Sequence, residues 1–569
     1  MNLSRITCEL KNACITTFAI LLVACGGSGG NDDINTPPPV ANPPAPPPIS
    51  LEARNEAALL ANQATFGMPW ETLEDMARQG RADWLESQFA RPVTYHRPTI
   101  VDIVRRRDAG EFDAFEDDIE YLIFARRLAW WHNTVIADDT LRQRVAFALS
   151  QIFVVSDNVD VLEVYPNALG GYYDMLLDNA FGNYRDLLRD VTYSPAMGVY
   201  LSHLNNAKAD PGLGTFPDEN YAREVMQLFS IGLFELNEDG SRKRDSNGDA
   251  IPTYDNTDIG EFAKVFTGFS FGGPGAVFGN NTEPNFSVPM QLFDEAHSPG
   301  EKQLLRGVSI PDGLTATQDV EAAIDNLFNH PNVGPFLGRL LIQRLVTSNP
   351  SPAYVARVSR AFADNGLGVR GDMKAVIRAI LLDPEATNPP DAFTGGKLTE
   401  PVVRYVSMLR RFGARSDDGF IAALGYFLQI ETLQHPLSSR SVFNFYLPDH
   451  QPSGAIADAG LYAPELQIID ANTVISWANF IDAIFFGDVV TDAPAGFNEV
   501  TLEPTRWLAL TDTPSVLVDE LNTLITAGTA SQATLDAVVT SISEFPQPEL
   551  RLALAVYYLS IAPEGVHSQ

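Results

Sequence analysis

Apolar residues recur at the 3.6-residue spacing of an α-helix from Leu51 to the end of the chain, and this period limits the fold more than any other sequence feature. The segment 52–66 is typical, because Ala57 and Leu60 fall on one face and a glycine follows the last turn. No segment alternates strongly enough between apolar and polar residues to build a sheet. The sequence therefore predicts a large all-α, multi-helix body over residues 51–569, with no major sheet.

Two segments interrupt the helical pattern. Residues 237–254 are rich in Asp, Asn and Gly, which is typical of a β-hairpin or an extended loop. Residues 268–309 contain many glycines and prolines and form the longest irregular stretch. Loops of this length are usually functional or disordered. We expect both segments at the periphery of the helical body.

The cysteines and the net charge exclude several classes of protein. The three cysteines all lie in the first 25 residues, so the body can form no disulfide, cysteine–zinc site, c-type haem site or cysteine nucleophile. A net charge of −33 argues against a nucleic-acid partner, because phosphates would be repelled. The sequence identifies no cofactor, but an acidic surface can attract divalent cations, which leaves calcium open as a ligand.

The first 24 residues have the pattern of a lipoprotein signal peptide. The apolar run Cys14–Ala24 is too short to span a bilayer and matches a signal-peptide core. It ends in Leu-Val-Ala followed by Cys25, which resembles a bacterial lipobox, whose cysteine is lipidated and becomes the new N-terminus. An ordinary signal peptide with a chance cysteine is the alternative. Gly26 follows where an aspartate would favour inner-membrane retention, so the resemblance implies a lipid anchor in the outer membrane of the cell envelope.

Residues 25–50 are predicted to form a tether. They contain clusters of glycine and proline and almost no large apolar side chains, so they cannot bury a core. Glycine makes such a chain flexible, and proline clusters favour the extended polyproline II conformation. We expect a semi-rigid spacer between the lipid anchor and the body.

The segment 217–237 has the densest mixture of paired charge and apolar periodicity in the chain. It predicts a helix from about Asp218 to Ile231 that is closed by Gly232, because acids favour the first turn and glycine favours the end. We expect the other helices to pack around this central helix.

One stripe of the central helix is polar. Glu219 with Arg223 and Asn220 with Glu224 are four residues apart, and Gln227 continues the stripe. A solvated or structurally paired face is one interpretation. If the stripe faces inward, Glu219, Arg223 and Glu224 form a buried charge network, which is a candidate site for binding, metal ligation or acid/base catalysis.

Two arginines lie inside a second helical segment, 141–155, which is apolar over most of its circumference and is expected to be deeply buried. Arg142 and Arg144 stand near its start, where a positive charge opposes the helix dipole. Buried arginines need carboxylate partners. We expect the acids of the central helix to supply them, which makes both arginines candidate binding residues.

The chain has eight histidines, and none occurs in an HxxxH or HExxH pattern. A zinc-hydrolase motif is therefore absent. His297, inside the long irregular stretch, is the best candidate for a functional imidazole, and a surface loop histidine is the alternative.

Asp245, Asn247 and Asp249 resemble the start of a calcium-binding loop, with oxygen ligands at the first, third and fifth positions. The sixth position is Ala250 rather than glycine, and the twelfth is Asn256 rather than glutamate. A hairpin turn is the favoured interpretation, and a calcium site at these three residues is the alternative.

A set of segments together resembles a bacterial family, known only as domain of unknown function 1800. These segments are LLANQATFG (59–67), LRQRVAFALSQIFVVSD (141–157), AFGNYRDLLRDVTYSPAMGVYL (180–201), PDENYAREVMQLFSIGL (217–233), LIQRLVTSNPSPAYV (341–355), GVRGDMKAVIRAILLDPEA (368–386), KLTEPVVR (397–404) and SVFNFYLPDH (441–450). They cover about residues 51–467 and leave the C-terminal helices of 468–569 outside. The resemblance implies an uncharacterised exported protein, often encoded beside a second exported protein, and supplies no catalytic residues.

Two functions fit these features. The first is a lipid-anchored binding and assembly protein of the cell envelope that acts with an exported partner. The second is a secreted, metal-assisted hydrolase of envelope or polysaccharide material, with Glu219, Arg223, Glu224 and His297 at its site. The sequence leaves open whether the protein is an enzyme.

Overall fold

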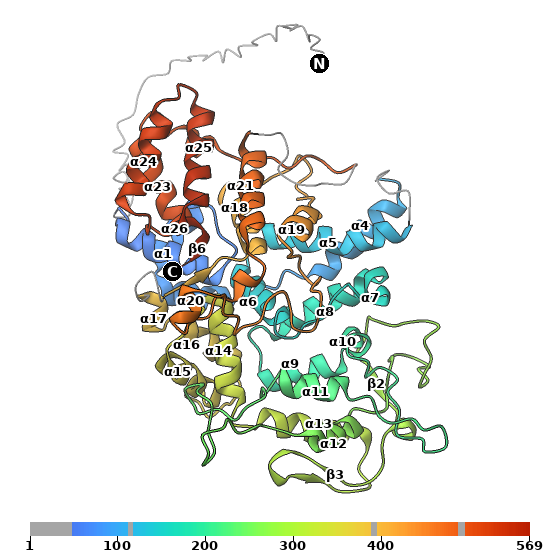
Figure 1. Ribbon diagram of the computed structural model, residues 1–569. Helices are drawn as coiled ribbons and strands as arrows, with labels where there is room; N and C mark the ends of the chain where they lie inside the picture. Colours follow the sequence, from blue (N-terminus) through green and yellow to red (C-terminus); the bar gives the residue numbers. More distant parts are fainter. Residues whose placement is uncertain (1–47, 112–117, 389–394, 487–495, 569) are drawn as a thin grey trace, which may run out of the picture. The chain divides into compact units, whose positions relative to one another are not determined.

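The computed structural model describes residues 48–111, 118–388, 395–486 and 496–568. The chain divides into two units, Met1–Pro48 and Ile49–Gln569. The predicted signal peptide, Cys25 and nearly all of the predicted tether lie outside the described residues. The second unit contains every helix and strand described below (Figure 1).

The body is built from helices, as the apolar period predicts. Among the described residues they are α1 (Leu51–Ala64), α2 (Trp70–Gln79), α3 (Arg81–Phe89), α4 (His96–Asp108), α5 (Asp118–Ile136), α6 (Thr140–Ser150), α7 (Asp160–Val164), α8 (Pro166–Asn179), α9 (Tyr184–Tyr193), α10 (Pro195–Tyr200), α11 (Asn220–Gln227), α12 (Asn256–Val265), α13 (Ala316–Phe328), α14 (Val333–Leu345), α15 (Pro352–Ala363), α16 (Met373–Leu381), α17 (Pro384–Thr387), α18 (Pro401–Arg411), α19 (Tyr426–Glu431), α20 (Ala455–Asp458), α21 (Ala471–Phe486), α22 (Thr505–Leu508), α23 (Pro514–Thr526), α24 (Gln532–Ser543), α25 (Pro548–Ile561) and α26 (Pro563–Val566).

Strands are short, and across the described ranges they form only two-stranded antiparallel pairs. The pairs are β1 (Phe269–Ser270) with β2 (Gln291–Leu292), β3 (Lys302–Gln303) with β4 (Ser309–Ile310), and β5 (Lys397–Leu398) with β6 (His567–Ser568). Three 3₁₀ helices complete the regular structure: η1 (Asp294–Ala296), η2 (Leu305–Gly307) and η3 (Pro464–Gln467). The all-α prediction without a major sheet is confirmed.

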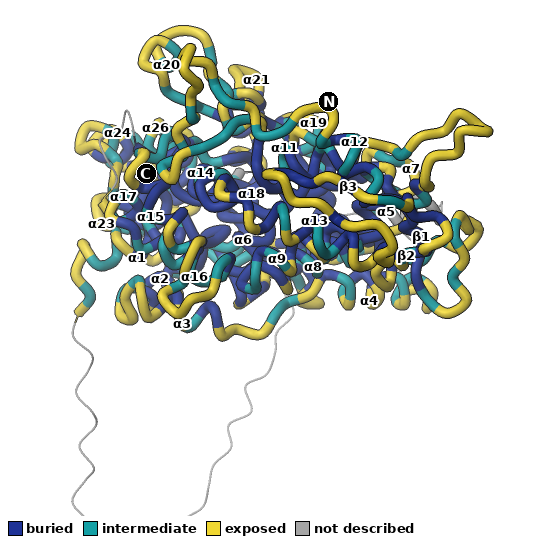
Figure 2. The backbone as a smooth tube through the Cα atoms, turned by 90° about the horizontal axis from the view of Figure 1, so that it is seen from below, coloured by how far each residue is buried: buried dark blue, intermediate teal, exposed yellow. Residues whose placement is uncertain are grey.

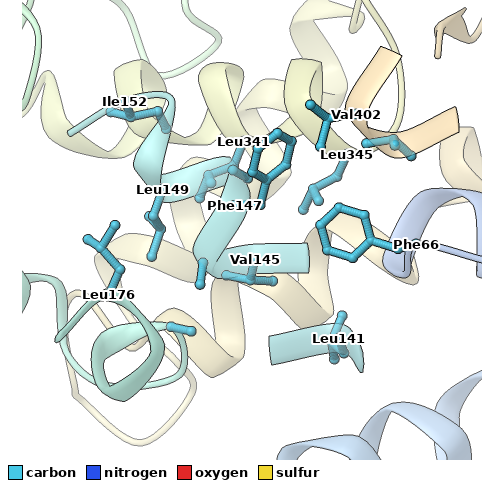
Figure 3. Packing of buried hydrophobic residues seen from close by; sticks show 14 of the residues in the cluster. Phe66, Leu141, Val145, Phe147, Leu149, Ile152, Leu176, Leu341, Leu345 and Val402 are labelled. Atoms are coloured by element: carbon cyan, nitrogen blue, oxygen red, sulfur yellow. The ribbon is translucent and has the colours of Figure 1, made fainter. Parts of the chain in front are cut away.

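The centre of the core is α6. All eleven of its residues are buried, including Arg142 and Arg144. It packs against α1, α3, α8 and α14, and Figure 3 shows its apolar side chains among Phe66, Leu176 and Leu341 from three other parts of the chain. Figure 2 shows the buried residues gathered in the interior, with exposed loops around them. The expectation that 141–155 is deeply buried is correct, and α6 takes the central place that we expected for the 217–237 segment.

The helix of that segment is shorter than predicted. α11 ends at Gln227 instead of Ile231 because its last turns widen: Phe229 N–H donates to Glu224 C=O and Ile231 N–H to Met226 C=O, five residues back. Gly232 then adopts a positive φ of 71°, as expected for the residue that closes this turn.

Helices at the end of the chain close the body. α23, α24 and α25 pack on one another, α25 also packs on α21, and α23 packs on α1. β6 pairs with β5, which fixes residues 567–568 against the start of the segment leading to α18. Among the described residues, no helix combines the length and apolar character needed to cross a membrane.

Candidate anion-binding cleft

A cleft of about 700 Å³ opens beside α11 and α14. Its lining comes from the residues that follow α6, from 227–236, from the hairpin residues 240–244, from α14, and from 442–462. A volume of 300–1,000 Å³ is typical of sites for small ligands. The cleft therefore has the size of a small-ligand site, and it is assembled from segments that are far apart in the sequence.

The charge of this cleft is opposite to that of the chain. Four arginines line it, Arg242, Arg244, Arg339 and Arg344, against a single acid, Asp449. None of the four forms an ion pair with a described residue. On a chain of net charge −33, such a cluster creates a local positive potential that attracts anions.

Aromatic rings hold three of these guanidinium groups. Arg242 lies over Phe234, with 4.5 Å between the guanidinium carbon and the ring centroid, and Arg339 lies over Tyr462 at 5.0 Å. Arg344 lies over the Tyr446 ring at 4.5 Å. A cation over a ring keeps its charge while its planar position is restrained. Three of the four arginines are thus oriented by rings rather than by an ion pair.

The floor of the cleft contains buried polar atoms without partners. Arg344 is 4% exposed, and its Nε has no hydrogen-bond partner. The Oε1 atoms of Gln151 and Gln343 also have none, although the Nε2 of Gln343 donates to the carbonyl oxygens of Ser348 and Pro448. Buried polar groups are normally paired. A ligand that accepts from Arg344 and donates to the glutamine oxygens would satisfy them.

A buried carboxylate, Glu400, balances the charge beneath the floor. Its Oε2 accepts hydrogen bonds from Gln151 Nε2 (2.5 Å), Gln434 Nε2 (2.6 Å) and the Tyr446 hydroxyl (2.9 Å). Burial raises the pKa of Glu400, but Lys397 and the nearby arginines outweigh burial, so the pKa lies below its usual value. Glu400 therefore stays ionised and fixes Gln151 in place under the cleft.

Arg144 and Lys397 join the same network from either side. Arg144 Nη2 lies 3.9 Å from Glu400 Oε1 and donates to the Arg344 carbonyl oxygen at 2.7 Å. Lys397 Nζ donates to the same carbonyl at 3.0 Å and lies 3.1 Å from Glu465 Oε1. Burial lowers the pKa of Arg144, and Glu400 opposes this shift. Three cations and two carboxylates thus form a floor with excess positive charge.

The walls of the cleft are apolar. Leu233, Phe443 and Leu447 line it and remain 49%, 46% and 38% exposed. Full burial of such a side chain from water stabilises by about 1.5–3 kcal/mol, and these three, already more than half buried, would each supply up to roughly half of that. The cleft therefore suits a ligand that carries an anionic group on an apolar body.

The polar stripe of α11 is divided between solvent and interior. Glu219 and Arg223 form an exposed pair, with 3.3 Å between Oε2 and Nη2 and side chains that are 50% and 41% exposed. Glu224 is buried, its Oε2 has no hydrogen-bond partner, and burial raises its pKa against the opposing charge of Arg223. The three residues therefore do not form the buried network that we considered.

The other predicted binding residues have separate positions. Gln227 lines the cleft and accepts a hydrogen bond from the Tyr254 hydroxyl (3.3 Å). Asn220 is exposed and donates to Ser202 Oγ at 3.4 Å. Arg142 is buried, donates to the Leu177 carbonyl oxygen and stacks on a phenylalanine ring.

The predicted pairing of the α6 arginines with the acids of α11 is wrong. Glu400 lies nearest to Arg144, as described above. Arg142 pairs with no described carboxylate within ion-pair distance, and burial lowers its pKa against the opposing charges of Asp139 and Asp178. The sequence identified the burial of these arginines but not their partners, which lie hundreds of residues away or on the main chain.

His297 is buried in a closed cluster of charge. Its Nε2 lies 3.1 Å from Asp319 Oδ2, its Nδ1 lies 2.9 Å from the Thr267 carbonyl oxygen, and Lys302 Nζ lies 2.6 Å from the same Asp319 oxygen. His297 does not line the cleft. The imidazole is a buried structural group rather than an exposed loop side chain.

The segment 237–254 forms consecutive antiparallel turns, so the hairpin prediction is confirmed. Asp245 Oδ1 accepts the backbone N–H groups of Asn247 and Asp249, each at 2.9 Å, and these bonds lower the pKa of Asp245. Within the described ranges, no three His, Cys, Asp or Glu side chains converge on a possible metal position. Calcium binding at Asp245, Asn247 and Asp249 stays a prediction.

The cleft arginines are candidate binding residues that our sequence analysis missed. Arg344 stands inside an apolar helix, which is the same signal that indicated Arg142 and Arg144. Arg242 and Arg244 stand in a segment that we interpreted only as a turn. No sequence signal joins these arginines, because they come from two elements that meet only in the folded chain.

A family model for proteins of unknown function, DUF1800, matches residues 59–565. The chain belongs to the DUF1800 family. The match runs through α25, so this DUF1800 protein shares with its family the C-terminal helices as well as the segments of residues 51–467. Neither a curated protein nor a solved structure matches the chain.

Proposed function

We propose that this protein is an envelope binding protein whose cleft holds a ligand with an anionic group and an apolar body. The observation that carries the proposal is the lining: four arginines and one aspartate in a chain of net charge −33. Arginine presents a planar fork of donors that matches carboxylate, sulfonate and phosphate groups.

Each part of the cleft has a role in this proposal. Arg242, Arg244 and Arg339 attract the anionic group and raise its rate of association. Arg344 donates hydrogen bonds to the anionic group at the floor, where exclusion of water strengthens the interaction. The exposed Leu233 and Phe443 cover the apolar part of the ligand. A neutral ligand of the same shape would gain only the last contribution.

The sequence supports the cellular setting of this function. The lipobox-like motif at Cys25 and the following Gly26 favour a lipid anchor in the outer membrane, and residues 25–50 would hold the body away from the membrane surface. An exported partner protein remains part of the proposal, as the family resemblance suggested. Binding of an anionic ligand is compatible with a role in assembly with that partner.

A metal-assisted hydrolase is the weaker alternative. Its candidate residues are dispersed, since Glu219 and Arg223 face solvent, Glu224 is buried, and His297 lies in the closed cluster with Asp319. Acid/base catalysis needs such groups within hydrogen-bond reach of one substrate. The arginine cleft offers binding groups but brings none of these four residues into its lining.

A pair of matched probes tests the proposal. The sulfonate dye 1-anilinonaphthalene-8-sulfonate and the uncharged N-phenyl-1-naphthylamine have similar aromatic bodies, and both report binding by fluorescence. We expect tighter binding of the sulfonate, an affinity that falls with added salt, and a loss of about tenfold or more in Arg344→Gln. Arg189→Gln removes an exposed arginine outside the cleft and serves as the control. Equal binding of the two probes would refute the proposal.

A further inference from the structure

A second, much smaller cavity lies among α1, α18, α21 and the end of α25. It has a volume of about 40 Å³, and its lining includes Arg404, Ser407, Arg411, Trp477 and Ser560. A cavity of roughly 10–15 Å³ already holds one water-sized sphere. The space therefore fits a monatomic ion or a few waters, and excludes the ligands considered for the arginine cleft.

The charge of the lining is unbalanced. Besides the two arginines it contains His567 but no aspartate or glutamate. Neither Arg404 nor Arg411 lies within ion-pair distance of a described carboxylate. Burial lowers the pKa of both guanidinium groups to about 10, and the charge of Glu465 opposes this shift at Arg404. Arg404 is buried and Arg411 is half-buried. Buried charges in proteins are normally paired, because desolvation of an unpaired charge is costly.

Hydrogen bonds leave part of each guanidinium group available. Arg404 donates to the carbonyl oxygens of Thr399 (2.5 Å) and Val566 (3.5 Å), and Arg411 donates to Asn62 Oδ1 (2.7 Å). The neighbouring Arg410 is different, since its guanidinium donates to four carbonyl oxygens at 2.6–3.1 Å. Arg410 is satisfied by the main chain, whereas Arg404 and Arg411 face the cavity with fewer acceptors.

Three further donors around the cavity have no partner. The hydroxyls of Ser407 and Ser560 and the indole Nε1 of Trp477 are buried, and none has a hydrogen-bond partner. The three residues are 5%, 4% and 5% exposed. The indole N–H can only donate, and a hydroxyl can turn its hydrogen toward an acceptor. The lining thus combines three donors without partners with two guanidinium groups whose acceptors, Thr399 O, Val566 O and Asn62 Oδ1, leave other N–H groups free.

We propose that this cavity is a binding site for a monatomic anion, a halide such as chloride. An anion in this space would accept hydrogen bonds from the donors within its reach and would offset the positive charge of the two guanidinium groups. Water in the same space would accept two hydrogen bonds at most and would leave the net charge unchanged. The anion would link α18 to α21 and α25 and so stabilise the C-terminal helices against the body.

Halide-dependent stability tests the site. Thermal unfolding of the protein is measured at constant ionic strength while sodium gluconate is replaced by sodium chloride. Because a ligand that binds only the folded state stabilises it with the logarithm of its concentration, we expect Tm to rise by about 1–3 °C and then to follow log concentration. Gluconate is too large for the cavity, so the comparison removes general salt effects.

Variants assign the effect to the cavity. Arg411→Met and Ser407→Ala each remove a donor and should lose at least half of the chloride-dependent shift. Arg189→Gln removes the charge of an exposed arginine elsewhere and should keep the whole shift. A shift that is equal in all three variants would overturn the proposal, because it would arise from the surface.

Bromide gives a test whose crystallographic part needs no variant. Crystals of the protein grown with sodium bromide should show an anomalous peak in the cavity, within hydrogen-bond reach of Trp477 Nε1 and Ser407 Oγ. In solution, bromide should quench the fluorescence of the protein by a static component that is absent in Trp477→Phe. A cavity without an anomalous peak at saturating bromide would contain water only and would refute the site, even if Arg411→Met failed to fold.

Discussion

Two clusters of buried charge in this protein differ in whether a cation has a carboxylate partner within ion-pair distance. In the cluster of His297, Lys302 and Asp319, one carboxylate oxygen, Asp319 Oδ2, lies 3.1 Å from His297 Nε2 and 2.6 Å from Lys302 Nζ. At the floor of the cleft, Arg344 pairs with no described carboxylate and leaves Nε without a partner. Both clusters are more than nine-tenths buried, so burial does not distinguish them.

The difference lies in whether each charge has a partner inside the protein. A closed cluster fixes two elements together, and here Asp319 on α13 holds Lys302 of β3 and the end of η1. An open cluster keeps donors and acceptors available toward a cavity, at a cost in stability. Asp319 Oδ1 also has no hydrogen-bond partner, so unpaired polar atoms alone do not indicate a site. The unpaired atoms of Arg344, Gln151 and Gln343 belong to residues that line a cleft, whereas Asp319 does not line it.

Removal of Asp319 should give the largest loss of stability. Asp319→Ala leaves the buried Lys302 without its counter-charge, and the loss of one partner from a buried ion pair costs about 3–5 kcal/mol. Asp325→Ala on the same helix α13 removes an exposed partner of Arg185 and should cost less than about 1 kcal/mol. Urea unfolding of both variants measures the difference, and probe binding to the folded fraction should stay unchanged. Equal costs would remove the distinction between closed and open clusters.

Substitution of Arg344 should weaken ligand binding more than it lowers stability, which is the reverse of the result expected for Asp319→Ala. Arg344→Gln removes the guanidinium group that faces the cleft, and we expect binding of the sulfonate probe to weaken by about 2 kcal/mol, or roughly 30-fold. Stability should change less than in Asp319→Ala, because the buried Glu400 keeps the charges of Lys397 and Arg144 when that of Arg344 is removed. Fluorescence titration and urea unfolding of the same sample give the two values. A large loss of stability with unchanged affinity would assign Arg344 to the structure of the core.

The helical fold could be predicted because its signal is local. The apolar period that predicts α1 depends only on neighbouring residues, and α6 is recognisable as buried from its composition alone. The end of α11 could not be predicted in the same way. There the Tyr184 hydroxyl donates to the carbonyl oxygen of Phe229, and Asn332 donates to that of Ile231 at 2.9 Å, so residues 45 and 101 positions away complete the turn.

The cleft could be predicted only in part. Gln227 and Arg144 were candidates, and both lie in the cleft or directly under it. Arg339 and Arg242 were not, because a cluster of four arginines arises only when the hairpin meets α14. The acids of α11 drew attention through their density, yet density in sequence does not show which side of a helix faces the core.

Glu224 offers a smaller, pH-dependent test of an unpaired buried group. Burial raises the pKa of Glu224, against the opposing effect of Arg223, so the folded state holds the proton more tightly than the unfolded chain does. The free energy of unfolding therefore falls as pH rises from the unfolded pKa through the raised folded pKa, and the loss persists above that window.

The substitution Glu224→Gln should remove this loss. We expect the variant to be more stable than the natural protein at neutral pH, by about 1 kcal/mol, and equally stable at a pH below the unfolded pKa. Urea unfolding across pH 3–8 measures both limits. A variant that is less stable at neutral pH would show that the Glu224 carboxylate has a stabilising partner in the folded protein.

The exposed pair of Glu219 and Arg223 should show the smallest effect. Each side chain is at least 41% exposed, and solvent screens an ion pair at such a surface. We expect Glu219→Gln and Arg223→Met to change stability by less than about 0.5 kcal/mol and to leave probe affinity unaltered. The two substitutions combined should give the sum of the single effects, because the pair contributes little coupling. A tenfold loss of probe affinity in either variant would show that the binding site extends to the solvent-facing side of α11. Glu219 and Arg223 would then be binding residues rather than a solvated surface pair.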